Sequence, residues 1–282
     1  MTASATDATQ ASPGSTPPDY HIHTVLCKHA SGFLSEYRRT AARRGMTEMC
    51  FTDHVPSPTG YDPTNRMELE QFPLYRDMVR ELRDDAEPRV FFGIEADYYP
   101  QCEEFLAPWL PKQPFDLVLG SVHYIGNWGF DNPAERKKWD SADVEGVWRA
   151  YFALVVKLVA TGLFDVLSHF DLPKKFGHRL AEAPLRELVQ PVLDRVAQAG
   201  LAIELNTSGL RRPVGEIYPS PLILALARER GIPICFGSDA HRPEEVGAAF
   251  DQAVQLAREA GYTEQAVYCQ RQRTSRPLPP VR

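Results

Sequence analysis

The sequence predicts an α/β fold in which parallel strands close, or nearly close, into a barrel. Short runs of apolar and β-branched residues alternate about seven times with longer amphipathic stretches, as in repeated strand–helix units. Most of the short runs are apolar throughout, which is typical of strands buried on both faces of a parallel sheet. A doubly wound open sheet is the alternative, but no glycine-rich nucleotide fingerprint follows the first strand, and this weakens it.

The individual elements follow from these patterns and from their boundary residues. A helix that stops at a glycine has a favourable C-cap, and proline is favoured at the first helical position. Expected strands cover residues 20–24, 49–53, 90–95, 117–123, 164–169, 202–206 and 232–238. Expected helices cover residues 35–44, 67–85, 141–161, 184–199, 221–230 and 243–260.

Composition narrows the class of protein. The 282 residues are 43% hydrophobic and 24% charged, as in ordinary globular proteins, and the net charge is −6. No apolar run approaches the roughly 20 residues that a membrane span needs. The acidic balance argues against general affinity for a nucleic-acid polymer. Nothing in the sequence indicates the oligomeric state.

The cysteines and the chain ends complete the outline. Five cysteines, widely spaced and without a CxxC pair, form neither a disulfide framework nor a cysteine-built zinc site, and they favour a cytoplasmic location. Residues 1–18 are rich in Ser, Thr, Ala and Pro, without the pattern of a secretory signal, and are predicted to be a disordered tail. We expect one barrel domain over residues 19–273 and a frayed tail over residues 274–282.

Seven of the eight histidines lie at or just after the end of a predicted strand. The eighth, His178, has no such position and is expected to be a surface or loop residue. The third predicted strand ends in a carboxylate, Glu95, instead. The strand-end histidines are His21, His23, His29, His54, His123, His169 and His241.

In a parallel barrel these strand ends face one mouth, so residues distant in sequence converge there. The spacing in His21-x-His23 puts both imidazoles on one face of a strand, and the same holds for Asp239-x-His241 if that strand continues. A single buried histidine is often only a hydrogen-bonded core residue. Chance does not readily place seven of eight at equivalent positions, so we predict a polynuclear metal site held by imidazoles and carboxylates.

At this point the motifs resemble those of the PHP (polymerase and histidinol phosphatase) superfamily. They are the early HxH, Thr52-Asp53-His54, the strand-ending Glu95, two single histidines and the late Asp239-Ala-His241. The resemblance covers about residues 19–268 and implies a distorted seven-stranded (β/α)7, TIM-like barrel. The segments 120–131, 204–221 and 237–247 resemble the histidinol-phosphatase branch more narrowly.

The resemblance implies three divalent ions, which imidazole-rich ligation would allow to be Zn, Fe or Mn. Asp53 is interpreted either as an orienting neighbour of an imidazole or as a plain turn residue. The implied ligand sets are His21, His23, Glu95 and Asp239 for one ion, Glu95 as a bridge with His123 and His169 for a second, and His29, His54 and His241 for a third.

The implied activity is hydrolysis of L-histidinol phosphate to L-histidinol and phosphate, a step of histidine biosynthesis. Clustered metals lower the pKa of a bound water to about 7, which favours direct attack by water. Asp239 or His241 could assist proton transfer. Cations suited to gripping phosphate lie near the predicted mouth. They are Arg211, Arg212, Lys174, Lys175 and Arg242.

The substrate's ammonium and imidazole call for acidic and aromatic groups, which segments 97–99 and 128–131 could supply; packing at the barrel rim is the alternative for these side chains. Two other interpretations stay open. One is a PHP-type phosphoesterase for another small phosphate ester, such as a nucleotide. The other is a metal-stabilised domain without catalysis, which the full set of nine ligand positions disfavours.

Overall fold

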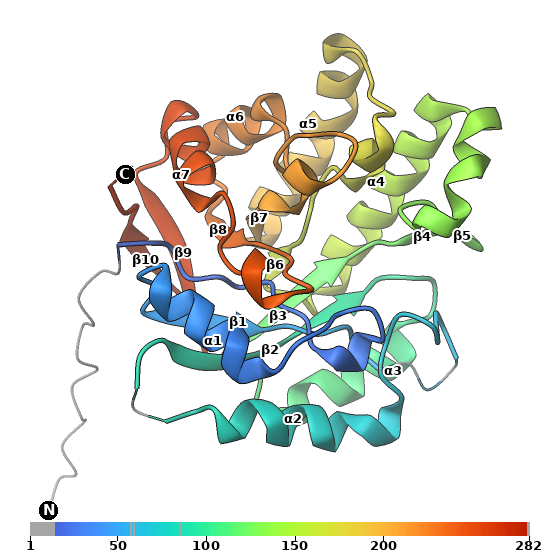
Figure 1. Cartoon of the computed structure of the whole chain (residues 1–282). Coiled ribbons are helices and arrows are strands. Elements are labelled where there is room, and N and C mark those ends of the chain that lie inside the picture. The colour runs from blue at the N-terminus through green and yellow to red at the C-terminus, as the bar shows by residue number, and fades with distance from the viewer. Residues whose placement is uncertain (1–14, 57, 59, 85, 281–282) are drawn as a thin grey trace, which may run out of the picture.

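A curled parallel sheet forms the centre of the computed structural model, which describes residues 15–280 except 57, 59 and 85 (Figure 1). Its strands follow the order β1-β2-β3-β6-β7-β8, all paired in parallel. Each of the six coincides with a predicted strand. Their bounds are β1 (Glu48–Phe51), β2 (Arg89–Asp97), β3 (Leu117–Ser121), β6 (Val166–Leu167), β7 (Ala202–Asn206) and β8 (Ile234–Gly237).

Residues 19–23 close this sheet into a barrel between its two edge strands. On one side Asp19 forms a parallel bridge with Met49, and on the other Ile22 bridges Ala240. The Tyr20 N–H donates to the Phe236 carbonyl at 2.9 Å. This segment is the predicted first strand, paired by isolated bridges rather than by a continuous ladder. The distorted seven-stranded barrel is thereby confirmed, with six regular strands and one irregular one.

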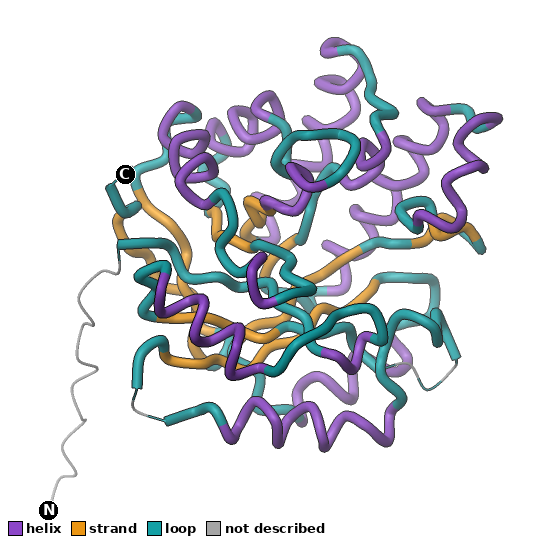
Figure 2. The backbone as a smooth tube through the Cα atoms, in the orientation of Figure 1, coloured by secondary structure: helices purple, strands orange, loops and turns teal. Residues whose placement is uncertain are grey.

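Helices surround the strands on the outside (Figure 2). All six predicted helices are present, although the sixth is split: η7 (Pro243–Glu245) precedes the helix proper, because Gly247 and Ala249 adopt φ of 62° and 59°. The sequence analysis missed the short α3. The α-helices are α1 (Leu34–Arg43), α2 (Phe72–Glu81), α3 (Glu103–Trp109), α4 (Val144–Thr161), α5 (Glu182–Ala199), α6 (Pro221–Glu229) and α7 (Phe250–Glu259).

Two short hairpins extend the barrel. Strands β4 (Tyr124–Ile125) and β5 (Trp128–Gly129) form one after β3, and β9 (Glu264–Cys269) pairs with β10 (Gln272–Pro277) to form the other. The second hairpin covers the amino-terminal end of the barrel: the Tyr268 ring packs edge-on against Tyr20, and the Tyr268 N–H donates to the Tyr20 hydroxyl at 3.0 Å. Inside the barrel, Tyr268 belongs to a buried apolar cluster with side chains of β1, β2, β3, β6, β7 and β8.

The predictions for the two chain ends need correction. Residues 274–277 do not fray, because they belong to β10, where the Arg276 guanidinium contacts the buried Glu48 at 2.7 and 2.9 Å. Residues 15–18 of the predicted disordered tail have a defined position, since the Thr16 hydroxyl donates to the Arg44 carbonyl at 2.6 Å and both prolines that follow are buried. Residues 1–14 and 281–282 lie outside the described residues.

The structure also bears on the cysteines and on membrane crossing. All five cysteines carry free thiols, and four of them are buried. Within the described residues, every helix is too short or too polar to cross a membrane.

The hairpin that covers the amino-terminal end should be needed for stability. Tyr268→Ala removes a 4%-exposed ring from the barrel's inner cluster, and we expect it to lower the free energy of unfolding by about 3–5 kcal/mol. Urea denaturation of the metal-free protein measures this change. Gln272→Ala, an exposed position on β10, is the control and should stay within about 0.5 kcal/mol of wild type. Equal stabilities for wild type and Tyr268→Ala would contradict a closing role for the hairpin.

Candidate metal centre

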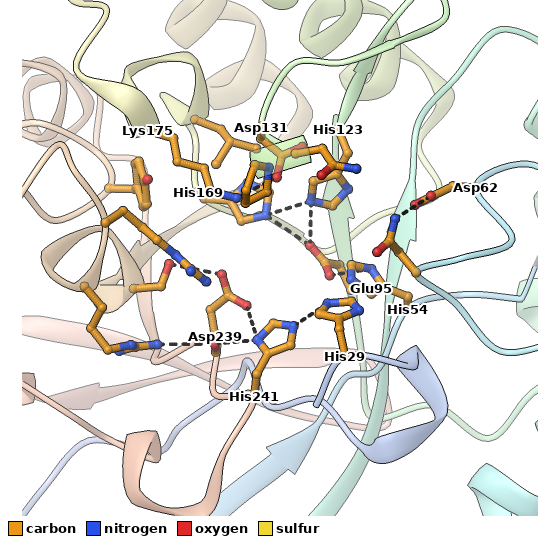
Figure 3. Close-up of a pocket in the computed structure, with 18 of the residues that line it drawn as sticks. His29, His54, Asp62, Glu95, His123, Asp131, His169, Lys175, Asp239 and His241 are labelled. Carbon is orange, nitrogen blue, oxygen red and sulfur yellow. Dashed lines mark hydrogen bonds and ion pairs between the residues drawn. The ribbon is translucent and has the colours of Figure 1, made fainter. Parts of the chain in front are cut away.

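The predicted strand-end residues do converge, around one pocket at the carboxyl ends of the barrel strands (Figure 3). The cavity has a volume of about 530 Å³. His21 and His23 lie beneath its floor and are fully buried. The other seven predicted ligands line it: His29, His54, Glu95, His123, His169, Asp239 and His241.

Glu95, at the end of β2, stands between two groups of imidazoles. Its Oε2 atom lies 3.4 Å from His21 Nε2 and 3.5 Å from His23 Nε2. Its Oε1 atom lies 3.1 Å from His169 Nε2 and 3.6 Å from His123 Nε2. Two ligand atoms that bind one tetrahedral metal at about 2.1 Å lie about 3.4 Å from each other. The distances from each Glu95 oxygen to its neighbouring imidazole nitrogens are close to this value. The geometry fits a carboxylate that bridges two ions.

Asp239 completes the first of these groups. Its Oδ1 atom lies 3.3 Å from His23 Nε2 and 3.8 Å from His21 Nε2, and the Ser208 hydroxyl donates to Oδ2 at 3.0 Å. Burial opposes ionisation of Asp239, but the surrounding histidines more than offset it and hold its pKa well below the ordinary value. The carboxylate is therefore ionised and available as a ligand.

A third group lies on the more exposed side of the pocket. The Nε2 atoms of His29 and His241 are 2.8 Å apart, and the His54 ring centre lies 5.7 Å from that of His29. Burial and the neighbouring imidazoles lower the pKa of His29 to about 4, and they also lower the pKa values of His54 and His241. Neutral imidazole is the form that binds metal. His54 also lies close to Glu95, with Nδ1 3.0 Å from Oε2, so it stands between the groups.

Buried atoms without partners show that the cluster suits metal ions. Buried polar atoms nearly always have hydrogen-bond partners, so atoms that lack one call for an explanation. Several such atoms in the described part of the chain face this centre, and their burial would be costly if nothing bound them. They are His21 Nε2, His23 Nε2, His54 Nδ1 and Glu95 Oε2. These residues can hold divalent cations.

Carboxylates lie beside the opposite ring nitrogens of two of these histidines, an arrangement that is common around metal-binding histidines. His123 Nδ1 lies 3.0 Å from Asp97, which is itself bound by the buried guanidinium of Arg66 at 2.9 Å. Asp53 lies 3.5 Å from His23 Nδ1, whereas it contacts His54 through that residue's backbone N–H. The structure thus favours the orienting role for Asp53, directed at His23.

Three buried carboxylates support the site in a way that the sequence did not predict. They are Asp19, Asp97 and Glu204, each fully buried. Asp19 accepts from the backbone N–H groups of Ser238 and Gly247, at 2.9 and 2.8 Å, and so fastens the first segment to the last part of the barrel. Asp97 was expected to contact substrate instead. Glu204 carries a sequence signal of its own, since it is an acidic residue inside an otherwise apolar strand-like run, where a buried carboxylate needs partners.

The predicted phosphate-binding cations divide into two kinds. Arg211, Arg212, Lys175 and Arg242 line the pocket. Lys174 does not: its ammonium is 2% exposed and contacts Asp171 at 2.9 Å and Glu216 at 2.7 Å. The prediction for Lys174 is therefore wrong, because this side chain is held in a buried ion pair away from the cavity.

The predicted acidic and aromatic groups are also only partly at the pocket. Asp131 lines it and contacts the Lys175 ammonium at 2.9 Å. Asp97 is used by Arg66 and His123, and Tyr99 stacks on Tyr61 with ring centres 3.9 Å apart. Trp128 packs edge-on against Trp139. For Tyr99 and Trp128 the alternative, packing at the rim, is the one that the structure shows.

His178 lies outside the centre, as expected. Its ring stacks flat on Trp139, with ring centres 4.4 Å apart.

Fold and site together define an α/β-barrel protein with a cluster of histidines and carboxylates, suited to divalent metal ions, at the carboxyl ends of its strands. Comparison with known families places it further. Residues 19–208 match the model described as the PHP domain, and residues 222–263 match the model described as PHP-associated. The chain belongs to the PHP family, which confirms the resemblance seen in the motifs.

Curated relatives and solved structures agree with this assignment. A Deinococcus radiodurans protein named "Probable histidinol-phosphatase" is 46% identical over 86% of this chain and 93% of its own length. A Bacillus subtilis histidinol-phosphatase is 29% identical over 83% and 96%. A Lactococcus lactis histidinol phosphate phosphatase, solved with zinc, L-histidinol and phosphate, superposes with a TM-score of 0.78 over 92% of this chain and 99% of its own, at 22% identity. The last match supports the fold alone.

Divalent metal should stabilise the folded chain. A ligand present at 100 times its Kd stabilises the native state by about 2.7 kcal/mol, so zinc should raise the melting temperature of chelator-treated protein by about 5–10 °C. Calorimetry with and without zinc measures the increment. His23→Ala should reduce it, and His178→Ala, an imidazole outside the centre, should retain it. A melting temperature that does not respond to zinc would contradict the metal centre.

Proposed function

We propose that this chain is a histidinol-phosphate phosphatase, a metal-dependent phosphomonoesterase that converts L-histidinol phosphate and water to L-histidinol and phosphate. The observation that carries the proposal is the pocket itself, where a cluster of imidazoles and carboxylates lies beside guanidinium and ammonium groups. The names of the relatives at 46% and 29% identity support the substrate. A place in histidine biosynthesis and a cytoplasmic location are parts of the same proposal.

The proposed centre holds three divalent ions, Zn, Fe or Mn, on the ligand sets that the family resemblance implies. The spacing of Glu95 between two imidazole groups supports two of these positions, and the close approach of His29 to His241 supports the third. Such ions, when bound, supply an activated water and neutralise charge on the phosphoryl oxygens. Glu95 would contribute to both of the first two positions, since its two oxygens face different imidazole groups.

Among the cations, Arg211 is the best placed to hold the phosphoryl group. One side of its guanidinium is fixed, since Nη2 donates to the Ser238 carbonyl at 2.7 Å and Nε lies 3.5 Å from Glu245. Its Nη1 atom is buried and lacks a hydrogen-bond partner within the described residues. A pre-oriented guanidinium with an unused N–H group suits a phosphate oxygen. Arg212, Lys175 and Arg242 are proposed as further contacts around the same cavity.

The acidic side of the pocket suits the cationic end of the substrate. Asp62 lines the cavity and accepts from the Tyr124 hydroxyl at 2.9 Å, whereas Asp131, which also lines it, is paired with the Lys175 ammonium at 2.9 Å. A carboxylate in a partly buried position favours a cation beside it. We propose that the ammonium of histidinol phosphate lies on this side, with its phosphate toward Arg211.

Direct attack by water is supported by the serines near the strand ends. The hydroxyl of Ser121 donates to Glu95, that of Ser208 to Asp239 and that of Ser238 to Asp19. Each hydroxyl therefore faces a carboxylate that is already used, as a proposed metal ligand or as an acceptor of backbone N–H groups, rather than a free histidine base. Proton transfer by Asp239 or His241 stays a prediction, since both belong to the proposed ligand sets.

Phosphate release from purified, metal-loaded protein tests the proposal. We expect kcat/KM for L-histidinol phosphate to exceed that for p-nitrophenyl phosphate and for nucleoside monophosphates by about 100-fold or more, because buried charged groups left unpaired penalise the wrong substrate. His21→Ala should lose turnover, and His178→Ala should keep it.

The other outcomes separate the alternatives. Equal or faster hydrolysis of a nucleotide would overturn the substrate and favour another small phosphate ester. Bound metal without turnover of any of these esters would favour a metal-stabilised domain without catalysis.

Arg211→Ala should lower kcat/KM for L-histidinol phosphate by about 10- to 100-fold, because a hydrogen bond to a charged group contributes about 1.5–3 kcal/mol. Steady-state kinetics measures this, with metal content checked in parallel, since Arg211 also contacts the carbonyl of Asp239. Arg242→Ala, an exposed cation at the same rim, should change kcat/KM at most about five-fold. Equal effects of the two substitutions would argue against a special role for Arg211.

A further inference from the structure

Glu204 is a buried carboxylate in a segment to which the proposed mechanism assigns no role. It lies in the middle of β7, with 0% of its surface exposed, at the start of the segment 204–221. An ionised carboxylate at such depth is costly unless several donors face it. The groups that face Glu204 therefore indicate why a carboxylate is present at this position.

Both oxygens of Glu204 contact proposed metal ligands. Oε1 lies 2.7 Å from Nδ1 of His21. Oε2 accepts the backbone N–H of His169 at 2.9 Å, and the Asn206 side-chain amide donates to the same oxygen at 3.0 Å. His21 belongs to the first ligand group beside Glu95 and His169 to the second. One carboxylate thus touches a ligand of each group.

We propose that Glu204 is a positioning residue that holds ligands of two metal positions at once, so that its loss weakens both. This inference rests on the proposed ligand sets. Its first task is to fix the tautomer of His21: a proton on Nδ1, donated to Oε1, leaves the Nε2 lone pair directed at Glu95 and Asp239. Its second is to hold the backbone of His169, whose φ is +20°.

The positive φ matters because few non-glycine residues adopt it without support from their surroundings. The hydrogen bond from the His169 N–H to Oε2 supplies that support. It keeps the His169 ring in the orientation in which Nε2 approaches Glu95 to 3.1 Å. The local backbone and the ligand geometry therefore depend on the same carboxylate.

The space around Glu204 is shaped for it. A side chain at Gly237 of β8 would overlap Oε1 of Glu204 and would come within 2.7 Å of His21 Cβ. Glycine at this position therefore lets the carboxylate reach His21. Strand β7 carries the carboxylate, and the neighbouring strand β8 leaves room for it at Gly237. Glu204 is therefore held in place against both ligands.

The side chain at this position must accept a hydrogen bond at each of two atoms, one from His21 and one from His169. A carboxylate offers two acceptors, whereas the amide introduced by Glu204→Gln offers one acceptor and one donor. If the amide nitrogen faced His21, it would require the Nδ1 lone pair and place the proton on Nε2, where the metal binds. If it faced His169, two donors would meet at the backbone N–H. Either orientation of the amide damages one ligand group directly, and it perturbs the other through the shared side chain.

The other orienting carboxylates make different contacts. Asp97 contacts the Nδ1 atom of His123. Asp53 contacts the Nδ1 atom of His23 and the backbone N–H of His54, which belong to the first and third ligand sets. Asp97 takes its second contact from Arg66, which belongs to neither group. Among these three, Glu204 alone links the two groups, and this difference is what an experiment can test.

Zinc binding to chelator-treated protein, measured by equilibrium dialysis at buffered free zinc with elemental analysis, tests the proposal without relying on activity. Glu204→Gln should weaken zinc binding at two positions by about 10- to 100-fold each, so at free zinc that just saturates wild type it should hold about two fewer ions per chain. Glu48→Gln is the matched control: Glu48 is equally buried, but it pairs with Arg276 at the other end of the barrel. It should retain the wild-type zinc count.

The result that would overturn the proposal is a folded Glu204→Gln protein with wild-type zinc affinity, or one that loses only a single ion. Lower stability of the metal-free variant with unchanged zinc affinity would mean a purely structural role and would also overturn it. Histidinol phosphate is absent from this test, so failure of the proposed function shows separately, in the turnover of wild type.

A measurement on wild type keeps the proposal testable if Glu204→Gln does not fold. In zinc-loaded protein with ¹⁵N-labelled histidine, one Nδ1–H signal, absent from His21→Ala, should be protected from exchange with solvent. Assignment of the His21 proton to Nε2, or a rapidly exchanging Nδ1 proton, would overturn the tautomer on which the inference depends.

Discussion

The buried carboxylate of Glu95 is the constraint on which the rest of the centre depends. It is 1% exposed, and its interior position would strongly disfavour a negative charge without compensation. Burial is opposed by His21, His54 and His123, and the net effect holds the pKa of Glu95 well below its ordinary value. The imidazoles gather around this charge, and they in turn need the outer carboxylates that orient them. Removing the central carboxylate would leave two groups of donors facing one another without a shared partner.

The barrel makes this arrangement possible by bringing distant segments together. His21 and His23 come from the irregular first segment, which is fastened between β1 and β8 by Asp19. Two ligand positions, His169 and Asp239, have positive φ, of 20° and 53°. Strained backbone concentrates at functional sites, where the surrounding structure holds it in place. The regular strands therefore form the packed core, and the irregular segments at their ends position most of the candidate metal ligands.

Much of this was predictable from the sequence, for a physical reason. Strand ends of a parallel barrel converge, so histidines and a glutamate after most of the apolar runs predict one site. Residues that orient those ligands are harder to recognise: Glu204 lies inside an apolar strand and resembles a core position, and Asp97 was expected to contact substrate instead. Lys174 and Lys175 show another limit, because side chains one residue apart on a 3-10 helix point about 120° away from each other. Strand β10 was missed since it lacks apolar alternation and is anchored by arginine contacts instead.

The placement of the first segment has a consequence for how the protein is made. Asp19 meets its partner in Ser238 across 219 residues of sequence, so the barrel cannot close while the ribosome is still translating its middle. At about 5–20 residues per second, the early histidines emerge long before Asp239 and His241 exist. Until then, the first two strands and their helices cannot be enclosed in the finished barrel. The residues of the centre are therefore all present only near the end of synthesis.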